Sequence, residues 1–187
     1  MLRIIGGTWR GRKLRFPASA DIRPTPDRVR ETLFNWLGAA VRGARCLDLF
    51  AGSGALGLEA LSRGAAHVTF VERDAAAAQA LRLLLREWQA GDAQVERADA
   101  LRYLLGDARA FDVVFVDPPF ASELLGRAAA LLEERHWLGA GARIYVECAA
   151  RDGLPSLPAA WRLLKAKRAG EVGYHLLAHA APDTHTT

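Results

Sequence analysis

Cysteine is scarce in this sequence, in which only Cys46 and Cys148 occur among 187 residues. Both lie within apolar runs and lack the spacing of a disulfide framework, so we expect two reduced core thiols in a cytoplasmic protein. No set of His, Cys and carboxylate residues suggests a metal site, and no metal is expected. Uninterrupted apolar runs of about 18 residues are missing too, which argues against a membrane-spanning helix. The first residues, MLRIIGGTWRGRKL, lack the apolar segment and cleavage site of a signal peptide.

The composition is that of an ordinary globular protein, with 51% hydrophobic and 25% charged residues. We expect a single domain over residues 1–187, in which residues 1–44 extend a core at 45–180 and residues 181–187 form a frayed tail. Charge is uneven, because residues 1–45 contain ten Lys or Arg and three Asp or Glu. The remainder is slightly acidic, so the N-terminal region is the one expected to meet a polyanionic partner. A solvated basic arm is the alternative.

Strand and helix patterns alternate from residue 45 onward. Short apolar runs predict strands at 45–50, 67–72, 93–97, 111–116 and 142–147, and helical periodicity predicts helices at 56–63, 74–90, 99–106 and 121–135. This alternation predicts an α/β fold with a mostly parallel sheet covered by helices on both faces, extended at one edge by an antiparallel hairpin around AGEVG. Upstream, residues 2–5 and 12–16 are expected to form a small β-hairpin. A helix then follows in TPDRVRETLFNWL, with Thr25 as its expected N-cap.

The first core strand ends in the motif DLFAGSGALG, where Gly52, Gly54 and Gly57 have the spacing G-x-G-x-x-G. Glycines permit a tight turn and close approach of a ligand to the backbone, and the helix that follows offers free N–H groups. The next two strands are followed by Glu72 and Asp99, at the same edge of a parallel sheet. Glu72 would hold a ribose and Asp99 an adenine amino group, so an adenosine-containing ligand is expected. A helix cap or a surface acid is the alternative for each carboxylate.

A dinucleotide oxidoreductase also uses this glycine spacing. Asp48 argues against it, because a carboxylate just before the loop disfavours a pyrophosphate but suits a cationic sulfonium. The sequence further on also lacks the His or Tyr/Lys set typical of hydride transfer.

The fourth core strand, VVFV, runs directly into DPPF at residues 117–120. Pro118 and Pro119 stop the sheet, so backbone carbonyls there remain acceptors. The Asp117 carboxylate and the Pro118 carbonyl could hold both N–H bonds of a conjugated exocyclic amine, and Asp117 could take its proton. Phe120 would stack on the base. Taken alone, DPPF could also be a strand-ending turn with a core Phe. The glycine loop and the two spaced acids earlier in the sequence favour a site over this alternative.

Four motifs together resemble one known family: IIGGTWRGRKL, RPTPDRVRETLFNWL, LDLFAGSGALGLEALSRGA and VDPPF. They are similar to the RsmD-type 16S rRNA guanine-N2 methyltransferases of the class I, Rossmann-like superfamily, over nearly the whole chain. The resemblance implies a seven-stranded sheet and S-adenosylmethionine-dependent methylation of one guanine amine in the small ribosomal subunit or its assembly intermediate. We expect a monomer.

The resemblance also implies roles for individual positions. The cofactor would contact Asp48, Phe50, Ala51, Gly52, Ser53 and Gly54 on its methionine side, Glu72 and Arg73 at the ribose, Asp99 and Ala100 at the adenine, and Arg23 and Thr25 at its carboxylate end. The target base would meet Asp117, Pro118, Pro119 and Phe120. Ribosomal RNA would meet Trp9, Arg10, Arg12, Lys13 and Arg15.

Several alternatives stay open. Trp9 could pack within the hairpin, Arg28 and Glu31 could form a surface ion pair rather than cover the cofactor, and Glu147 is either a site acid or a cap. An amine methyltransferase acting on DNA or on a protein amide is one rival. The other is an RNA-binding ribosome-assembly factor without catalysis.

Overall fold

The computed structural model describes residues 2–15, 25–119 and 123–180. Its helices are α1 (Asp27–Leu37), α2 (Ala55–Ser62), α3 (Ala75–Glu87), α4 (Ala100–Leu104) and α5 (Leu124–Glu134), with a short 3-10 helix η1 (Gly38–Val41). Its strands are β1 (Arg45–Asp48), β2 (His67–Val71), β3 (Ala93–Glu96), β4 (Phe111–Val116), β5 (Leu138–Ala149), β6 (Trp161–Ala169) and β7 (Val172–His179). None of the helices in the described ranges has the length and apolar character needed to cross a bilayer.

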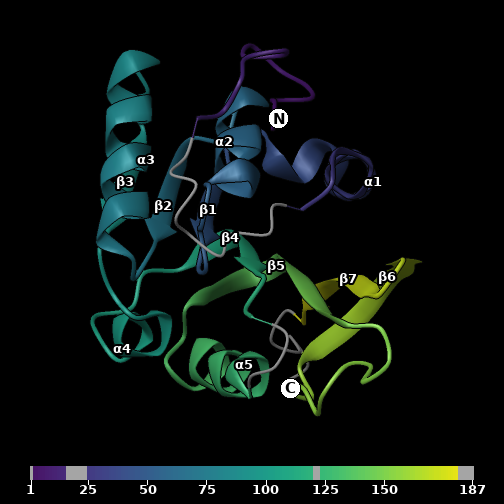
Figure 1. The fold of residues 1–187 in the computed structure, drawn as a ribbon. Coiled ribbons are helices and arrows are strands. Elements are labelled where there is room, and N and C mark those ends of the chain that lie inside the picture. The colour runs from purple at the N-terminus through teal and green to yellow at the C-terminus, as the bar shows by residue number, and fades with distance from the viewer. Residues whose placement is uncertain (1, 16–24, 120–122, 181–187) are drawn as a thin grey trace.

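The seven strands form one sheet in the order β3-β2-β1-β4-β5-β7-β6 (Figure 1). Strands β1 to β5 pair in parallel, and β7 lies antiparallel between β5 and β6. The predicted fold, a mostly parallel seven-stranded sheet with an antiparallel C-terminal hairpin, is confirmed. The strand order reverses between β1 and β4, which is where open α/β sheets bind ligands.

Helices cover both faces of the sheet, and each face has its own core. One core gathers the inward sides of α1, α2 and α3, and the other gathers those of α4 and α5. Side chains alternate along β4, so that Val113 and Phe115 enter the first core while Val114 and Val116 enter the second. Burial on both faces explains why this strand is an unbroken apolar run.

The N-terminal segment contains less β structure than predicted. A single antiparallel bridge joins Arg3 to Lys13, in place of two paired strands. The segment is held by Glu59, a fully buried acid of α2 that accepts hydrogen bonds from the N–H groups of Ile5 (2.9 Å) and Gly6 (2.8 Å). Backbone hydrogen bonds from Ile4 to Arg12 and from Leu14 to Leu2 flank the bridge, and after Ile4 the chain bonds to α2.

Two further boundaries differ from the predictions. Pro26, rather than Thr25, precedes the first residue of α1, and no side chain caps this end of the helix. The N-cap prediction for Thr25 is therefore wrong, because its hydroxyl bonds to Glu147 instead, at 3.0 Å. Strand β5 begins at Leu138, four residues before the predicted start, and pairs with β4 through an irregular register between Phe111 and Val113.

Candidate active site

The glycine loop connects β1 to α2 at the carboxyl end of the central strands. Gly52 and Gly54 have φ values of 53° and 76°, in the left-handed region that side chains other than glycine rarely adopt. Gly57 lies inside α2 for a different reason. A Cβ at this position would lie 2.2 Å from Cε1 of Phe70, so glycine allows α2 to approach β2 closely.

Glu72 follows β2 and connects this strand to the loop. Its Oε2 accepts a 2.7 Å hydrogen bond from the Gly52 N–H, and its Oε1 accepts a 2.7 Å bond from the Asp74 N–H. The carboxylate is half-buried, so it is oriented by the backbone and still reaches solvent at the sheet edge.

Asp48, the last residue of β1, is 2% exposed and accepts a 3.0 Å hydrogen bond from the Gly57 N–H in the first turn of α2. Burial raises the pKa of Asp48 to about 7; the Gly57 N–H opposes the increase, and the negative charge of Glu72 adds to it. Asp48 is therefore an acid whose ionised form would be favoured by a nearby positive charge.

Asp117 and Glu147 lie side by side at the ends of neighbouring strands. Val116 pairs with Val146 in the register of β4 and β5, so the next residue of each strand is one of these two acids. Glu147 is 3% exposed, and its Oε1 accepts hydrogen bonds from the Tyr145 hydroxyl (2.7 Å) and from the Thr25 hydroxyl (3.0 Å). The Thr25 hydroxyl also lies 3.4 Å from Oδ2 of the half-buried Asp117.

The register of β4 and β5 and the Thr25 hydroxyl, 3.0 Å from Glu147 and 3.4 Å from Asp117, bring the two carboxyl groups close enough to affect each other's ionisation. Burial raises the pKa of Asp117 well above its ordinary value, and the negative charges of Glu147 and Asp48 add to the increase. Burial also raises the pKa of Glu147, against the opposing hydrogen bonds from Tyr145, Thr25 and Asp117. Carboxyl groups this close cannot both ionise without cost, so they titrate as a pair.

The other residues predicted to line the site differ in how far they are buried. Asp99 is exposed and caps α4 by accepting a 3.0 Å hydrogen bond from the Arg102 N–H, which leaves its second oxygen at the sheet edge. Ala51 and Ser53 are buried in the loop, Ala100 is buried in α4, Phe50 is half-buried, and Arg73 is exposed. Pro118 is buried and Pro119 exposed. Arg23 and Phe120 lie outside the described residues.

Two residues of this network were missed or undecided from the sequence. Tyr145 was not predicted to reach the site, and Glu147 had two interpretations. The alternation of side chains along a strand could have predicted both, because Tyr145 and Glu147 are two residues apart and therefore share a face of β5. Asp117 lies on the same face of the neighbouring strand, two residues after Phe115, which pairs with Tyr145.

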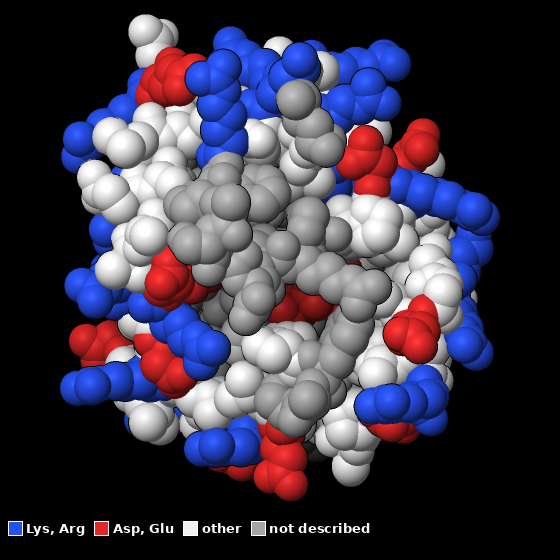
Figure 2. Space-filling view, in the orientation of Figure 1, with Lys and Arg blue, Asp and Glu red and all other residues white. Residues whose placement is uncertain are grey.

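Figure 2 shows acidic atoms recessed in a hollow at the centre of this face, near the ends of β4 and β5. A cluster of buried carboxyl groups suits a cation, and a sulfonium is a cation that binds without donating hydrogen bonds. Within the described ranges, no three His, Cys, Asp or Glu residues are grouped in a way that could hold a metal ion. The buried carboxyl groups fit a ligand that carries a positive charge, as S-adenosylmethionine does on its sulfur.

Comparison with known proteins decides the family. The family model described as conserved hypothetical protein 95 matches residues 2–178. The chain is 53% identical over 175 residues to ribosomal RNA small subunit methyltransferase D of Escherichia coli K12, covering 94% of this chain and 88% of that protein. The chain belongs to this methyltransferase family.

Other relatives agree with this assignment. The protein of the same name from Haemophilus influenzae is 47% identical over 179 residues, which cover 94% of this chain and 92% of that protein. A solved structure described as putative methyltransferase yhhF from Escherichia coli superposes with a TM-score of 0.91 at 51% identity, covering 97% and 99% of the two chains. An RNA methyltransferase from Salinibacter ruber in complex with S-adenosyl-L-homocysteine has the same fold, with a TM-score of 0.65 and 16% identity over 86% and 97% of the two chains.

The basic N-terminal loop of this family member lies far from the carboxyl edge of the sheet. Thr8 and Trp9 bond to Ser62, the last residue of α2, and the ring of Trp9 lies 5.1 Å from that of Trp88, at the end of α3. Both helices begin at the carboxyl edge and end at the opposite edge. Trp9 thus packs against the end of α3 rather than within the hairpin, and the RNA contact of its half-buried ring stays a prediction. The exposed side chains around it are Arg10, Arg12, Lys13 and Arg15, and Lys and Arg gather at the top of Figure 2, where this segment lies in Figure 1.

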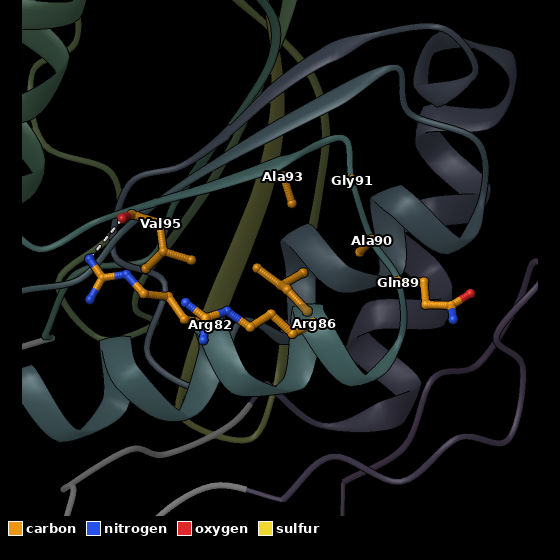
Figure 3. A pocket seen from close by; sticks show the side chains of 8 residues that line it. Arg82, Arg86, Gln89, Ala90, Gly91, Ala93 and Val95 are labelled. Carbon is orange, nitrogen blue, oxygen red and sulfur yellow. Dashed lines mark hydrogen bonds between the residues drawn. The ribbon is translucent and has the colours of Figure 1, made fainter.

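A second hollow lies between α3 and the edge strand β3 (Figure 3). Arg82 and Arg86 extend from α3 along it, and the Arg82 guanidinium donates a 2.9 Å hydrogen bond to the Val95 carbonyl. Its lining residues include none of the residues predicted for the cofactor, the base or the RNA. This hollow is therefore separate from the predicted site.

Proposed function

We propose that this chain transfers a methyl group from S-adenosylmethionine to the exocyclic N2 amine of one guanine in 16S rRNA, within the small ribosomal subunit or its assembly intermediate. The observation that carries the proposal is the placement of Asp117, beside the glycine loop at the switch point of the sheet and paired with Glu147. The names of the relatives supply ribosomal RNA as the substrate class. Such a substrate places the reaction in the cytoplasm, and we expect the protein to act as a monomer.

The cofactor would be held by the carboxyl edge of β1, β2 and β3. Asp48 and the loop from Phe50 to Gly54 would line the methionine side, Glu72 would accept hydrogen bonds from the ribose, and Asp99 would accept one from the adenine amino group. Arg23 and Thr25 would lie at the cofactor carboxylate, and Arg73 and Ala100 beside the nucleoside. When bound, the cofactor supplies an electrophilic methyl group on a sulfonium.

Asp117 would act on the target amine. The lone pair of a guanine N2 amine is delocalised into the ring, which makes the nitrogen a weak nucleophile. Hydrogen bonds from its two N–H groups to the Asp117 carboxylate and the Pro118 carbonyl would favour a localised lone pair directed at the methyl group. Asp117 would then take the proton that the amine must lose. Phe120 would stack on the base, worth roughly 1–3 kcal/mol, and Pro119 would fix the turn.

The N-terminal basic side chains would contact rRNA phosphates. Arg10, Arg12, Lys13 and Arg15 are exposed on one segment, and such contacts position a substrate without reading its sequence. Their position at the far ends of α2 and α3 implies an RNA that extends well beyond the methylated base.

Tritiated methyl transfer tests the proposal. Small subunits from a strain lacking the relative of this enzyme should accept label from S-adenosylmethionine, and mapping should place the label on the N2 of one guanine. Asp117→Ala should lose transfer while S-adenosylmethionine affinity stays within a few-fold of wild type. Label in DNA or protein instead would favour the rival amine methyltransferases. Binding to small subunits without any transfer would favour a non-catalytic assembly factor.

A further inference from the structure

We propose that the Asp117–Glu147 carboxyl pair holds one proton before the cofactor binds and releases it when the sulfonium enters, so that Asp117 becomes a base only beside a methyl donor. This inference rests on the proposed cofactor, S-adenosylmethionine, but not on the identity of the methylated base. It adds Glu147 to the functional residues as a positioning residue, and it couples cofactor binding to the ionisation of the site.

The geometry places three acids on one face of three neighbouring strands. Asp48 pairs with Phe115, Phe115 pairs with Tyr145, and Asp117 and Glu147 follow two residues later on their strands. Side chains two residues apart share a face, so Asp48, Asp117 and Glu147 all point toward the α1 side of the sheet. Thr25, just before α1, is buried against this face; its hydroxyl donates to Glu147 and lies 3.4 Å from Asp117.

The hydrogen bonds decide which member holds the proton. Glu147 accepts from the Tyr145 and Thr25 hydroxyls at 2.7 and 3.0 Å, and both bonds stabilise a carboxylate. The hydroxyl contact of Asp117 within the described residues is longer, 3.4 Å to Thr25, and the pKa of Asp117 is raised well above its ordinary value. The proton therefore resides mainly on Asp117 and is donated to Glu147.

The neighbouring charges act in the same direction. From β1, Asp48 faces the pair, and Glu72, after β2, acts on Asp48. From β5 itself Tyr145 donates to Glu147, from β7 Tyr174 acts on Tyr145, and Cys148 is influenced by Glu147. Of these groups Asp48 and Glu72 supply the negative charge, and they favour the protonated pair, whereas the Tyr145 hydroxyl is neutral and favours the Glu147 carboxylate. An entering cation has the opposite effect, because a positive charge within a few ångströms favours ionised carboxylates.

Protons balance over one turnover. The pair starts with one proton and releases it to solvent when the cofactor binds. During methyl transfer the C–S bond breaks, the C–N bond forms, and Asp117 takes the proton that the amine loses. The pair then again holds one proton, now beside a neutral thioether. The net reaction releases one proton, as transfer from a sulfonium to a neutral amine requires.

Calorimetric titration in buffers of different ionisation enthalpy measures this coupling without any methyl acceptor. Wild-type protein and Glu147→Gln are each titrated with S-adenosylmethionine and with S-adenosylhomocysteine near pH 7. We expect wild type to release about one proton more than the variant with the sulfonium. With the thioether we expect no difference between the two proteins. Because the two proteins are compared with the same ligand, any protons that the ligand itself gains or loses on binding cancel in the difference.

Two outcomes would overturn the proposal: the same proton count in wild type and Glu147→Gln with the sulfonium, or an equal difference with both ligands. Tyr145→Phe is the second variant if Glu147→Gln does not fold. Loss of its hydroxyl destabilises the Glu147 carboxylate, so proton release should persist to higher pH than in wild type. An unchanged pH profile would contradict the role of the pair. Methyl transfer by wild type is measured separately, so a protein that shows the coupling but methylates another acceptor would refute only the proposed function.

Discussion

Gly52 donates its backbone N–H to the carboxylate of Glu72 at 2.7 Å, across 20 residues of sequence. The bond joins the glycine loop after β1 to the end of β2, so the two parts of the proposed cofactor site hold one another. Because the second carboxylate oxygen is bound by the Asp74 N–H, also at 2.7 Å, the group is oriented before any ligand arrives.

Glu72→Gln should lower the affinity for S-adenosylmethionine. An amide has one acceptor oxygen, so its NH2 group would face one of the two backbone N–H donors and leave that donor unpaired. The amide would then be misoriented toward the proposed ribose hydroxyls; a hydrogen bond from a ligand to a charged group is worth about 1.5–3 kcal/mol, and its loss corresponds to a roughly 10- to 160-fold higher Kd. Isothermal titration calorimetry measures the change, with the exposed Glu134→Gln in α5 as a control that keeps wild-type affinity. Wild-type affinity in Glu72→Gln would remove this residue from the site.

Gly57→Ala should destabilise the fold. The added methyl would lie 2.2 Å from Cε1 of Phe70 and 2.9 Å from Cγ1 of Val68, so α2 would have to move away from β2. Overpacking of this kind costs about 1–3 kcal/mol in the free energy of unfolding, which urea denaturation measures. Gly126→Ala in α5 is the matched control, because its methyl would meet nothing within 4 Å. That variant should gain up to about 1 kcal/mol from helix propensity.

Asp48 should make the ligand-free protein less stable at neutral pH than in mild acid. Its pKa is about 7 when folded against an ordinary value of 3.8, so the folded protein binds more protons between these values. The free energy of unfolding therefore falls by roughly 4 kcal/mol for this group as the pH rises through this window. Above the window this contribution no longer changes with pH. Asp48→Asn should remove that part of the decrease, whereas the exposed Asp107→Asn should not. The free energy of unfolding is obtained from denaturation curves at several pH values between 4 and 8. The same dependence of this free energy on pH in all three proteins would contradict the expectation.

Replacing Arg10, Arg12 and Lys13 with Gln should weaken binding to small subunits and reduce the salt dependence of that binding. Each lost phosphate contact lowers the slope of log K against log salt by about 1, so a decrease of about 2–3 is expected. The control replaces three exposed basic residues of β6, namely Arg162, Lys165 and Lys167, with the same change in net charge. Equal effects of the two triple variants would show that net charge, rather than the N-terminal surface, determines binding.

Local patterns were enough to predict most of the fold. The strands from β1 to β4 lie within about two residues of their predicted ranges. A strand that is buried on both faces of the sheet consists of consecutive apolar residues, and such a run is easy to recognise in the sequence. The acids at the strand ends follow from the same regularity, since parallel strands end at a common edge. Asp48, Glu72 and Asp117 could therefore be placed together without knowledge of any contact.

Partners distant in sequence could not be predicted. Thr25 has the sequence context of an N-cap, yet it bonds to Glu147, 122 residues away. Its competing partners depend on how α1 docks onto the sheet, which no local pattern encodes. The same holds for Glu59, which accepts hydrogen bonds from the N–H groups of Ile5 and Gly6, more than 50 residues away.

The packing of Trp9 against Trp88 has a consequence for what the enzyme can accept. Helix α3, of 13 residues, spans about 20 Å between the cofactor edge and this contact. If the basic loop contacts the RNA as we propose, the loop and the methylated base would bind two points of one RNA about that far apart. We then expect a short oligonucleotide to reach only one of the two points and a rigid folded RNA to reach both.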